Sequence, residues 1–304
     1  MREPNDDGGT MNGERPEVLV AVGNPDHVEQ LTRTAGDIAR VREAGIRIVT
    51  VVVKSSTSPV SMFTDETIVQ EYSGDRRKFL ERAKATAPND IPVEGEIVVA
   101  RSAARGILQA IDEAEAEALV IGWQERTSRR DAILGTTVDA IIERSPCDVY
   151  VEHVGRVARS VETVLLPVAG GPHVRPAASV AKAIAAANDA TVVVVSVASP
   201  DDAEEASESI AAASDALVEA SGPSVDIETE LVESGDVEDA LVDLAQSHDV
   251  IVFGTTRHGA LRRRLVGSIP RRVTERTDRT VILARAAEGA VRRRLTSLFG
   301  QVRR

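Results

Sequence analysis

The residues best suited to bind a ligand are gathered in one loop of the C-terminal half. Gly254 closes a short apolar run, Arg257 and His258 follow it, and Gly267 and Ser268 open the next predicted helix. Glycine lets the backbone approach a ligand closely, and free N–H groups at a helix N-terminus attract phosphate oxygens. Ser268 can add a hydroxyl group, and Arg257 or His258 a charged donor. This combination predicts a site for an anion or a phosphate-bearing molecule.

The same residues also have explanations that need no ligand. Six arginines lie between residues 257 and 272 of this acidic chain. For the arginines at 262–264, a solvated helix face neutralised by local acidic residues is the preferred explanation. Gly267 and Ser268 can simply form a tight turn and a helix N-cap.

Residues for dedicated catalysis or metal binding are not recognisable. The sequence has no phosphate-binding Gly-Lys-Ser/Thr loop, no G-x-G-x-x-G, no His-Glu-x-x-His and no nucleophile elbow. His27 and His173 lie in predicted turns, without a Cys or carboxylate partner at metal-ligand spacing. We therefore expect no metal site and lean against an enzyme.

Charge and composition restrict the class of partner. The chain carries 48 acidic and 36 cationic residues, a net charge of −12, and its cationic residues include only four lysines. An acidic, lysine-poor surface suits a salt-rich, halophilic cytoplasm. The net charge and an aromatic content of 2% disfavour nucleic acid as a partner.

The N-terminal segment and the single cysteine give further expectations. Residues 1–15 are acidic and Gly-rich with no apolar signal-peptide core, so we expect a disordered tail whose true start is Met1 or Met11. No run of about 18 apolar residues occurs, so a cytoplasmic protein is predicted. Cys147 lies in a predicted strand and should be buried and unreactive.

The C-terminal segment, residues 288–304, has the pattern of a basic amphipathic helix. Its apolar residues recur at helical spacing between arginines: Val291, Leu295, Leu298, Phe299 and Val302. Such a helix can lie on an anionic membrane surface, dock on a partner, or pack against the acidic surface of its own chain.

An internal repeat organises the rest of the chain. Residues 18–22 align with residues 164–168, and each copy then alternates apolar strands with helices in the same order. Alternation of this kind predicts an α/β fold with two doubly wound, mostly parallel sheets. We place the two domains at residues 16–156 and 161–287, joined by a short linker.

The expected elements are specific enough to test. The first five strands are placed at 18–22, 47–53, 96–100, 118–121 and 147–151, and their counterparts at 164–168, 190–197, 226–232, 250–253 and 280–283. The first helix of each copy should end at a residue that tolerates the left-handed conformation, Gly45 or Asn188. Thr136 and Asp139 have the spacing of a capping box.

The loop after the fourth strand carries a family resemblance. After the strand, the loop consists of Gly254, two residues, a fourth position at Arg257, nine more residues and then Gly267-Ser268. This spacing resembles the nucleotide loop of universal stress proteins. The resemblance covers residues 16–287, once in each half of the chain. It implies two five-stranded parallel sheets of order 3-2-1-4-5 with helices on both faces. It also implies an adenine nucleotide such as ATP or AMP, and domains paired through their fifth strands, at 147–154 and 280–284.

Departures from the family pattern assign the site to the second domain. Nucleotide-binding members carry Gly at the fourth loop position, where this chain has Glu125 and Arg257. They also carry Asp after the first strand, where Gly23 and Ala169 stand here. An acid at the phosphates would repel them, so domain 1 is taken as degenerate, and Val168 and Ala169 complete the predicted site of domain 2.

The resemblance also suggests a biological setting. Residues 268–273 and 280–283 resemble stress-protein modules associated with amino-acid permeases. The leading hypothesis is therefore a cytoplasmic stress-response or regulatory protein that forms an intramolecular pseudo-dimer, with a homodimer possible. The alternative is a nucleotide-free interaction protein that regulates a membrane transporter through the C-terminal helix. A third hypothesis, ranked last, is the slow ATP hydrolysis that the resemblance implies for some members of the family.

Overall fold

The structure is a computed structural model, and it describes residues 15–55, 57, 59–123, 135–155, 160–171, 174–255 and 268–287. The predicted C-terminal helix and nearly all of the predicted N-terminal tail lie outside these ranges. The elements of the first half are β1 (Glu17–Ala21), α1 (Val28–Arg42), β2 (Gly45–Val53), α2 (Asp65–Glu71), α3 (Gly74–Thr86), β3 (Val93–Ala100), α4 (Ala103–Glu113), β4 (Ala118–Trp123), α5 (Thr136–Arg144) and β5 (Asp148–His153). Those of the second half are β6 (Thr163–Pro167), α6 (Val174–Asn188), β7 (Thr191–Ala198), α7 (Ala203–Glu219), β8 (Ile227–Glu233), α8 (Val237–Gln246), β9 (Val250–Gly254), α9 (Ser268–Arg276) and β10 (Thr280–Arg285).

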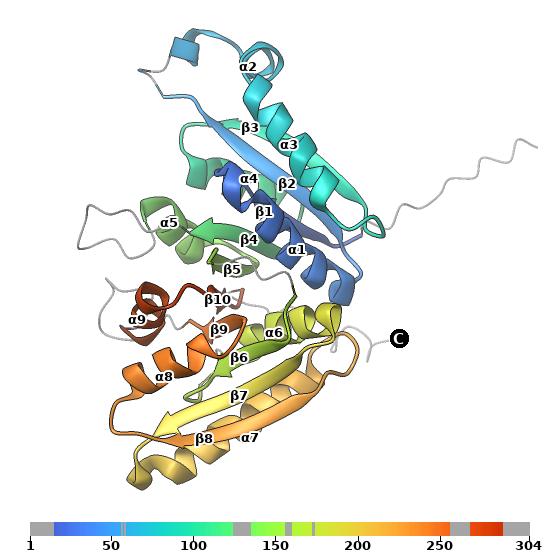
Figure 1. The fold of residues 1–304 in the computed structure, drawn as a ribbon. Coiled ribbons are helices and arrows are strands. Elements are labelled where there is room, and N and C mark those ends of the chain that lie inside the picture. The colour runs from blue at the N-terminus through green and yellow to red at the C-terminus, as the bar shows by residue number, and fades with distance from the viewer. Residues whose placement is uncertain are drawn as a thin grey trace, which may run out of the picture.

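The strands form one continuous sheet through both halves (Figure 1). Its order is β3-β2-β1-β4-β5-β10-β9-β6-β7-β8, so each half has the predicted order 3-2-1-4-5. All pairings are parallel except that between β5 and β10, which is antiparallel. At this junction Val151 lies opposite Leu283, its counterpart in the repeat. The fifth strands therefore join the halves about an approximate two-fold axis.

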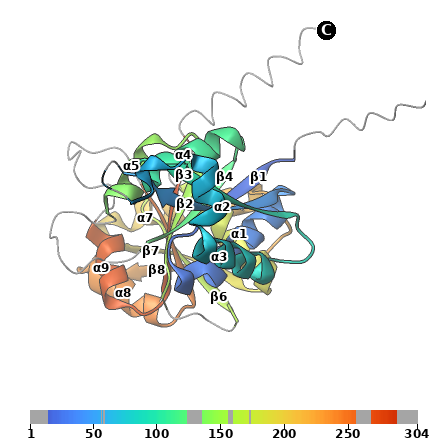
Figure 2. The same cartoon turned by 90° about the horizontal axis from the view of Figure 1, so that it is seen from above.

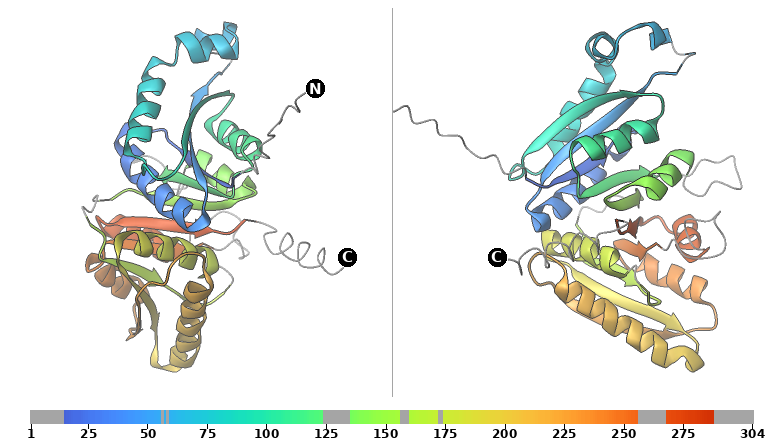
Figure 3. Two further views of the ribbon diagram at one scale, coloured as in Figure 1. Left: turned by 90° about the vertical axis from the view of Figure 1, so that its right-hand side faces the viewer. Right: turned by 180° about the vertical axis from the view of Figure 1, so that it is seen from behind.

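Helices cover both faces of the sheet (Figure 3). One core layer is built on α1, α3, α6 and α7, and the other on α4, α5, α8 and α9. In the view from above, one half lies in front of the other, so that the two overlap (Figure 2). Across the junction, α1 packs against α6. The doubly wound α/β fold is thus confirmed.

The strands follow from runs of β-branched residues, with small shifts from the predicted bounds. The third strands, expected at 96–100 and 226–232, are Val93–Ala100 and Ile227–Glu233. The extra residues in β3 pair in register with β2, so they extend the sheet at its edge. Hydrogen bonds to a neighbouring strand, absent from the sequence pattern, decide where a strand starts.

Two local predictions about helix ends are wrong. The left-handed residue after α1 is Glu43, with φ of 54°, and after α6 it is Asp189, with φ of 55°. Gly45 instead begins β2, because a sharp end to α1 leaves only Glu43 and Ala44 between the helix and the strand. Asn188 is the last residue of α6, and its side-chain amide donates to the carbonyl of Ile184 at 2.8 Å.

The predicted capping box of α5 is also absent. Gly135 stands at the N-cap position with φ of 91°, and no side chain makes a capping bond. Thr136 is therefore already the first helical residue. Its hydroxyl cannot take the N-cap role that the spacing to Asp139 suggested.

Polar contacts reinforce the junction between the halves. The Arg42 guanidinium donates to the Asp148 carboxylate at 2.6 Å and to the Tyr150 hydroxyl at 2.8 Å. The other carboxylate oxygen of Asp148 accepts from the backbone N–H of Ala287 at 2.9 Å. Arg285 donates to the carbonyl of Ser145 at 3.1 Å. These bonds link α1, β5 and the end of β10.

Cys147 is buried, as predicted. Burial raises the pKa of its thiol to about 11, and the Ser145 hydroxyl opposes this only in part. Burial is thus confirmed, whereas the low reactivity expected of a protonated, shielded thiol stays a prediction.

Candidate functional site

An apolar cavity of about 250 Å³ lies at the carboxyl ends of β6, β7 and β9. Three of the seven predicted site residues line it: Val168, Ala169 and Gly254. The sheet order reverses here, because β6 has β7 on one side and β9 on the other. Ligands of open parallel sheets bind in the crevice at such a reversal. The structure thus brings the chain that follows strand one of the repeat, residues 168–170, beside the end of strand four at Gly254.

Backbone bonds hold the rim of the cavity. The N–H of Val168 donates to the carbonyl of Val195 at 2.8 Å, which ties the chain leaving β6 to β7. On the other side, Thr255 donates its backbone N–H to the carbonyl of Ala284 at 2.8 Å. Gly170 has φ of 76°, so the loop turns away in a conformation that favours glycine. The rim is therefore set by the sheet itself.

The floor and walls of the cavity are hydrophobic. Val195 and Val197 contribute from β7, Val237 and Leu241 from α8, and Phe253 from β9. Side chains of this kind bind a flat, weakly polar group such as a heterocyclic base by removing it from water.

The other end of the cavity meets the start of α9. Ile269 and Pro270, in the first turn of that helix, line the cavity. The first turn of a helix has N–H groups without helical partners and a partial positive charge. Since Pro270 has no N–H, the available donors here are those of its neighbours. The cavity therefore combines an apolar chamber with an electropositive helix start.

The remaining predicted residues are placed only in part. Arg257, His258 and Gly267 lie outside the described residues. Ser268 is the first residue of α9, and its side chain is also outside the description. The predicted anion contacts of these four residues stay predictions.

Sequence reasoning missed the cavity wall supplied by the helices. The helical spacing of Val237 and Leu241 indicates an amphipathic helix, and this is correct for α8. That pattern cannot distinguish a side chain packed in the core from one that borders an open chamber. The position of the residues near the start of α8 was the available signal, because this end of each helix faces the carboxyl ends of the strands.

The corresponding place in the first half is built differently. The strand registers put Gly122 where the second half has Gly254, and Trp123 where it has Thr255. Trp123 is 3% exposed, and its ring lies 5.1 Å from that of His153 in an edge-on contact. The His27 ring lies over Gly122, and burial lowers its pKa. The first half thus has the bulky ring of Trp123 where the second half has the small side chain of Thr255, and the His27 ring lies over the neighbouring Gly122.

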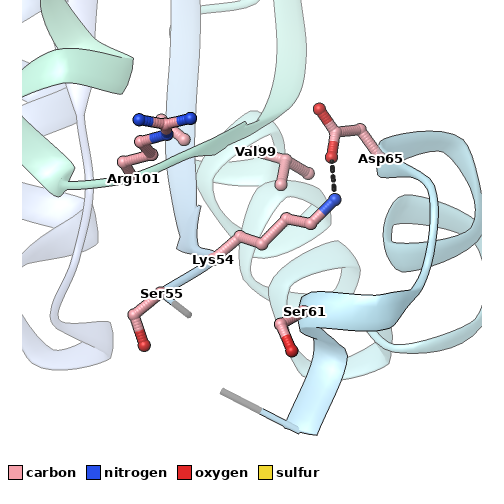
Figure 4. Close-up of a pocket in the computed structure, with 7 residues that line it drawn as sticks. Lys54, Ser55, Ser61, Asp65, Val99 and Arg101 are labelled. Atoms are coloured by element: carbon pink, nitrogen blue, oxygen red, sulfur yellow. Dashed lines mark hydrogen bonds and ion pairs between the residues drawn. The ribbon is translucent and has the colours of Figure 1, made fainter. Parts of the chain in front are cut away.

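A second, polar cleft of about 740 Å³ lies at the carboxyl ends of β2 and β3 (Figure 4). Lys54 extends across it and donates to the Asp65 carboxylate at 2.9 Å and to the carbonyl of Phe63 at 2.7 Å. Ser55, Ser61 and Arg101 also line it. Asp65 neutralises the lysine charge from within the chain. This cleft is therefore a weaker candidate than the apolar cavity.

The described residues hold neither a candidate metal cluster nor a helix suited to a membrane. Among them, no three or more His, Cys, Asp or Glu side chains are grouped so that they could hold a metal ion. Within the same ranges, no helix is long and apolar enough to cross a membrane.

Comparison with known proteins gives consistent matches. The model of the universal stress protein family matches twice, at residues 15–153 and 160–285. A universal stress protein from Archaeoglobus fulgidus DSM 4304 superimposes with a TM-score of 0.58 at 16% identity, over 89% of this chain and 96% of that one. The cytoplasmic domain of a prokaryotic cation chloride cotransporter superimposes with a TM-score of 0.59 at 10% identity, over 91% and 97%.

A curated relative is much longer than this chain. The Na(+)/H(+) antiporter NhaS5 from Synechocystis sp. is 22% identical over 255 residues. The match covers 83% of this chain and 35% of the antiporter, so the chain spans about a third of that protein.

Proposed function

Because this chain belongs to the universal stress protein family and carries two of its domains, we propose that it is a cytoplasmic regulatory protein that binds an adenine nucleotide through domain 2. The observation that carries the proposal is the apolar cavity at the ends of β6, β7 and β9, bordered by the start of α9. The base occupies the apolar chamber, and the phosphates lie toward Ser268 and the loop before it. ATP and AMP are the candidate ligands.

The asymmetry of the two domains supports a single nucleotide site. Domain 2 has the cavity lined by Ala169 and Gly254, whereas domain 1 places buried Trp123 at the position of Thr255. A loop with Arg257 also favours phosphate over one with Glu125. We therefore assign one nucleotide per chain.

Calorimetric titration of the full chain with ATP, AMP and adenosine tests this proposal. Ala169 is exposed at the rim of the cavity, so Ala169→Trp should obstruct the entrance without disturbing the core. We expect at least about tenfold weaker binding, the equivalent of about 1.4 kcal/mol. The matched control is Gly23→Trp at the corresponding place in domain 1, where an added Cβ would meet nothing within 4 Å. It should bind as the wild type does.

A second variant separates the phosphate contacts from the base contacts. Gly267→Ala combined with Ser268→Ala should weaken the binding of ATP and AMP while leaving that of adenosine nearly unchanged, because the proposal places the phosphates, and not the base, at these two residues. Absence of binding heat and of any thermal shift with all three ligands would refute the nucleotide proposal. Equal losses in the Ala169 and Gly23 variants would refute its assignment to domain 2.

The transporter relatives favour a second candidate function. We propose as the alternative that the chain is a nucleotide-free module that acts on a membrane transporter. The matches to an antiporter and to a cotransporter's cytoplasmic domain support it. The predicted basic helix at 288–304 would make the contact. Binding to anionic vesicles that is lost on removal of that segment and weakened by salt, with no nucleotide effect, favours this alternative.

A further inference from the structure

Buried polar side chains gather where the two domains meet. Helix α1 carries Gln30, Thr34 and Asp37 on one face, because residues at these spacings are neighbours on a helix. Their exposed fractions are 9%, 2% and 5%. Glu152, in β5, is fully buried beside them. Neither proposed function uses this group of residues.

Glu152 sits close to the centre of the junction. Strand alternation puts it on the same side of the sheet as Tyr150, whose ring belongs to the core layer formed with α1 and α6. In the antiparallel pairing of the domains it lies opposite Ile282. The corresponding position of domain 2 is Ala284. The acid therefore occurs on one side of the junction only.

Burial removes water from the Glu152 carboxyl group, and few protein groups take the place of that water as hydrogen-bond partners. Within the described residues, neither of its oxygens has a hydrogen-bond partner at regular geometry. The Thr34 hydroxyl and the Gln30 amide are near enough to favour the charged form somewhat. A buried carboxylate with so little compensation is costly, and the group relieves the cost by taking up a proton.

The charged groups on the two packed helices do not offset this cost. From α1, Asp37 adds a second acid, and Arg33 gives only a minor opposing attraction. Arg40 lies 3.6 Å from Asp37 but makes its two hydrogen bonds to Asp90. From α6, the buried cation is Lys182. Its ammonium group donates to the backbone carbonyls of Val218 and Ala220, away from the acids.

The strands around Glu152 bring few other titratable groups to this face. From β10, Ile282 and Ala284 lie on this side. In β4, Glu152 pairs with Gly122, over which the His27 ring lies. In β5, burial raises the pKa of Tyr150 to about 12, so this phenol is neutral at physiological pH.

Burial acts in the same direction on both acids, and repulsion from Asp37 adds to its effect at Glu152. Burial is the main cause that raises the pKa of Glu152 to about 7, and the nearby Asp37 adds to the rise. Burial likewise raises the pKa of Asp37 to about 7, against partial opposition from Arg40 and Arg33. Ionising either buried acid is costly, and a charge on Asp37 makes the ionisation of Glu152 costlier still.

We propose that Asp37 and Glu152 form a proton-binding site at the junction of the two domains, and that loss of its protons loosens the packing of α1 against α6 and β5. The ligand is a proton, and the site responds to pH near neutrality. The folded protein keeps protons here that the unfolded chain has already released. Stability is then highest at mildly acidic pH and falls as the pH rises through neutrality.

Urea unfolding of the full chain between about pH 5.5 and pH 8.5 tests the site. While a group is protonated in the folded state and ionised in the unfolded state, the unfolding constant rises tenfold per pH unit. The unfolding constant of the wild type should therefore rise about fifteenfold between pH 5.5 and pH 7 for each such group, since a group with a pKa of about 7 is half ionised in the folded state at pH 7. Glu152→Gln should flatten this dependence, because the amide stays neutral at every pH.

Matched variants make the result specific. Asp37→Asn should also flatten the profile, since each neutral substitute removes one acid and the repulsion on the other. Glu228→Gln, on the exposed edge strand β8, is the control and should retain the wild-type profile. Parallel profiles for the wild type, Glu152→Gln and Asp37→Asn would overturn the proposal.

Hydrogen exchange locates the effect and covers unfolding that is not two-state. Amides of α1, α6 and β5 should exchange faster at pH 8.5 than at pH 6 after correction for the intrinsic rate, by at least about tenfold, while those of β7 should change much less. In Glu152→Gln this difference should shrink. A pH effect spread evenly over both domains would contradict a junction site.

Discussion

The contact of Arg42 with β5 allows a quantitative test of how α1 is held against the fifth strand of domain 1, beside the junction. Its guanidinium donates to Asp148 at 2.6 Å, to the Tyr150 hydroxyl at 2.8 Å and to the carbonyl of Glu117 at 3.2 Å. The charged side chains are 15% and 22% exposed. The substitution Arg42→Met keeps an unbranched apolar stem and removes all three bonds together with the charge.

The expected loss follows from this geometry. Removing one partner of a fully buried ion pair costs about 3–5 kcal/mol, whereas an exposed pair contributes about 0–1 kcal/mol. Asp148 keeps some solvent and the N–H of Ala287, so its charge is partly compensated. We expect Arg42→Met to lower the free energy of unfolding by about 2–3 kcal/mol, between these limits.

Urea unfolding followed by circular dichroism measures this loss as a lower midpoint at an unchanged slope. The control is Arg271→Met, which breaks an exposed pair one turn apart in α9, with side chains 42% and 38% exposed. It should cost less than about 0.5 kcal/mol. If Arg42→Met lies within about 0.5 kcal/mol of this control, the partly buried contact does not stabilise the packing of α1 on β5 and the reasoning fails.

Two further predictions concern the same region. Gly155→Ala should destabilise by about 1–3 kcal/mol, because an added Cβ would collide with the backbone carbonyls of Asp278 and Arg279; Gly235→Ala, where a Cβ meets nothing within 4 Å, is the control, and equal thermal midpoints would contradict the clash. Cys147, with its pKa raised to about 11, should react with a thiol reagent at about pH 8 at least about a hundredfold more slowly in the folded chain than in urea. Labelling at the same rate in both states would show that the thiol is accessible.

The repeat and the strand patterns explain why the fold was predictable. Apolar β-branched runs such as residues 191–197 exclude helices, and their regular alternation with helices restricts the topology to a doubly wound sheet. The loop from Gly254 to Ser268 could be assigned to the ligand crevice because the carboxyl ends of parallel strands share one edge of the sheet. The helix ends could not be placed from the sequence in the same way, because Glu43 and Asp189 adopt the left-handed conformation although neither is a glycine.

The tertiary structure alone decided what covers each face. The alternation in residues 148–153 shows that Glu152 and Val151 point to opposite sides of β5, but a charged residue at such a position suggests a solvated side. Pairing with β10 and the packing of α1 and α6 bury it instead. Likewise, Val237 and Leu241 have the spacing of a core face, yet they border a cavity. Sequence periodicity indicates which face of a helix or strand a residue lies on. Whether that face is exposed to solvent depends on elements that are distant in the chain.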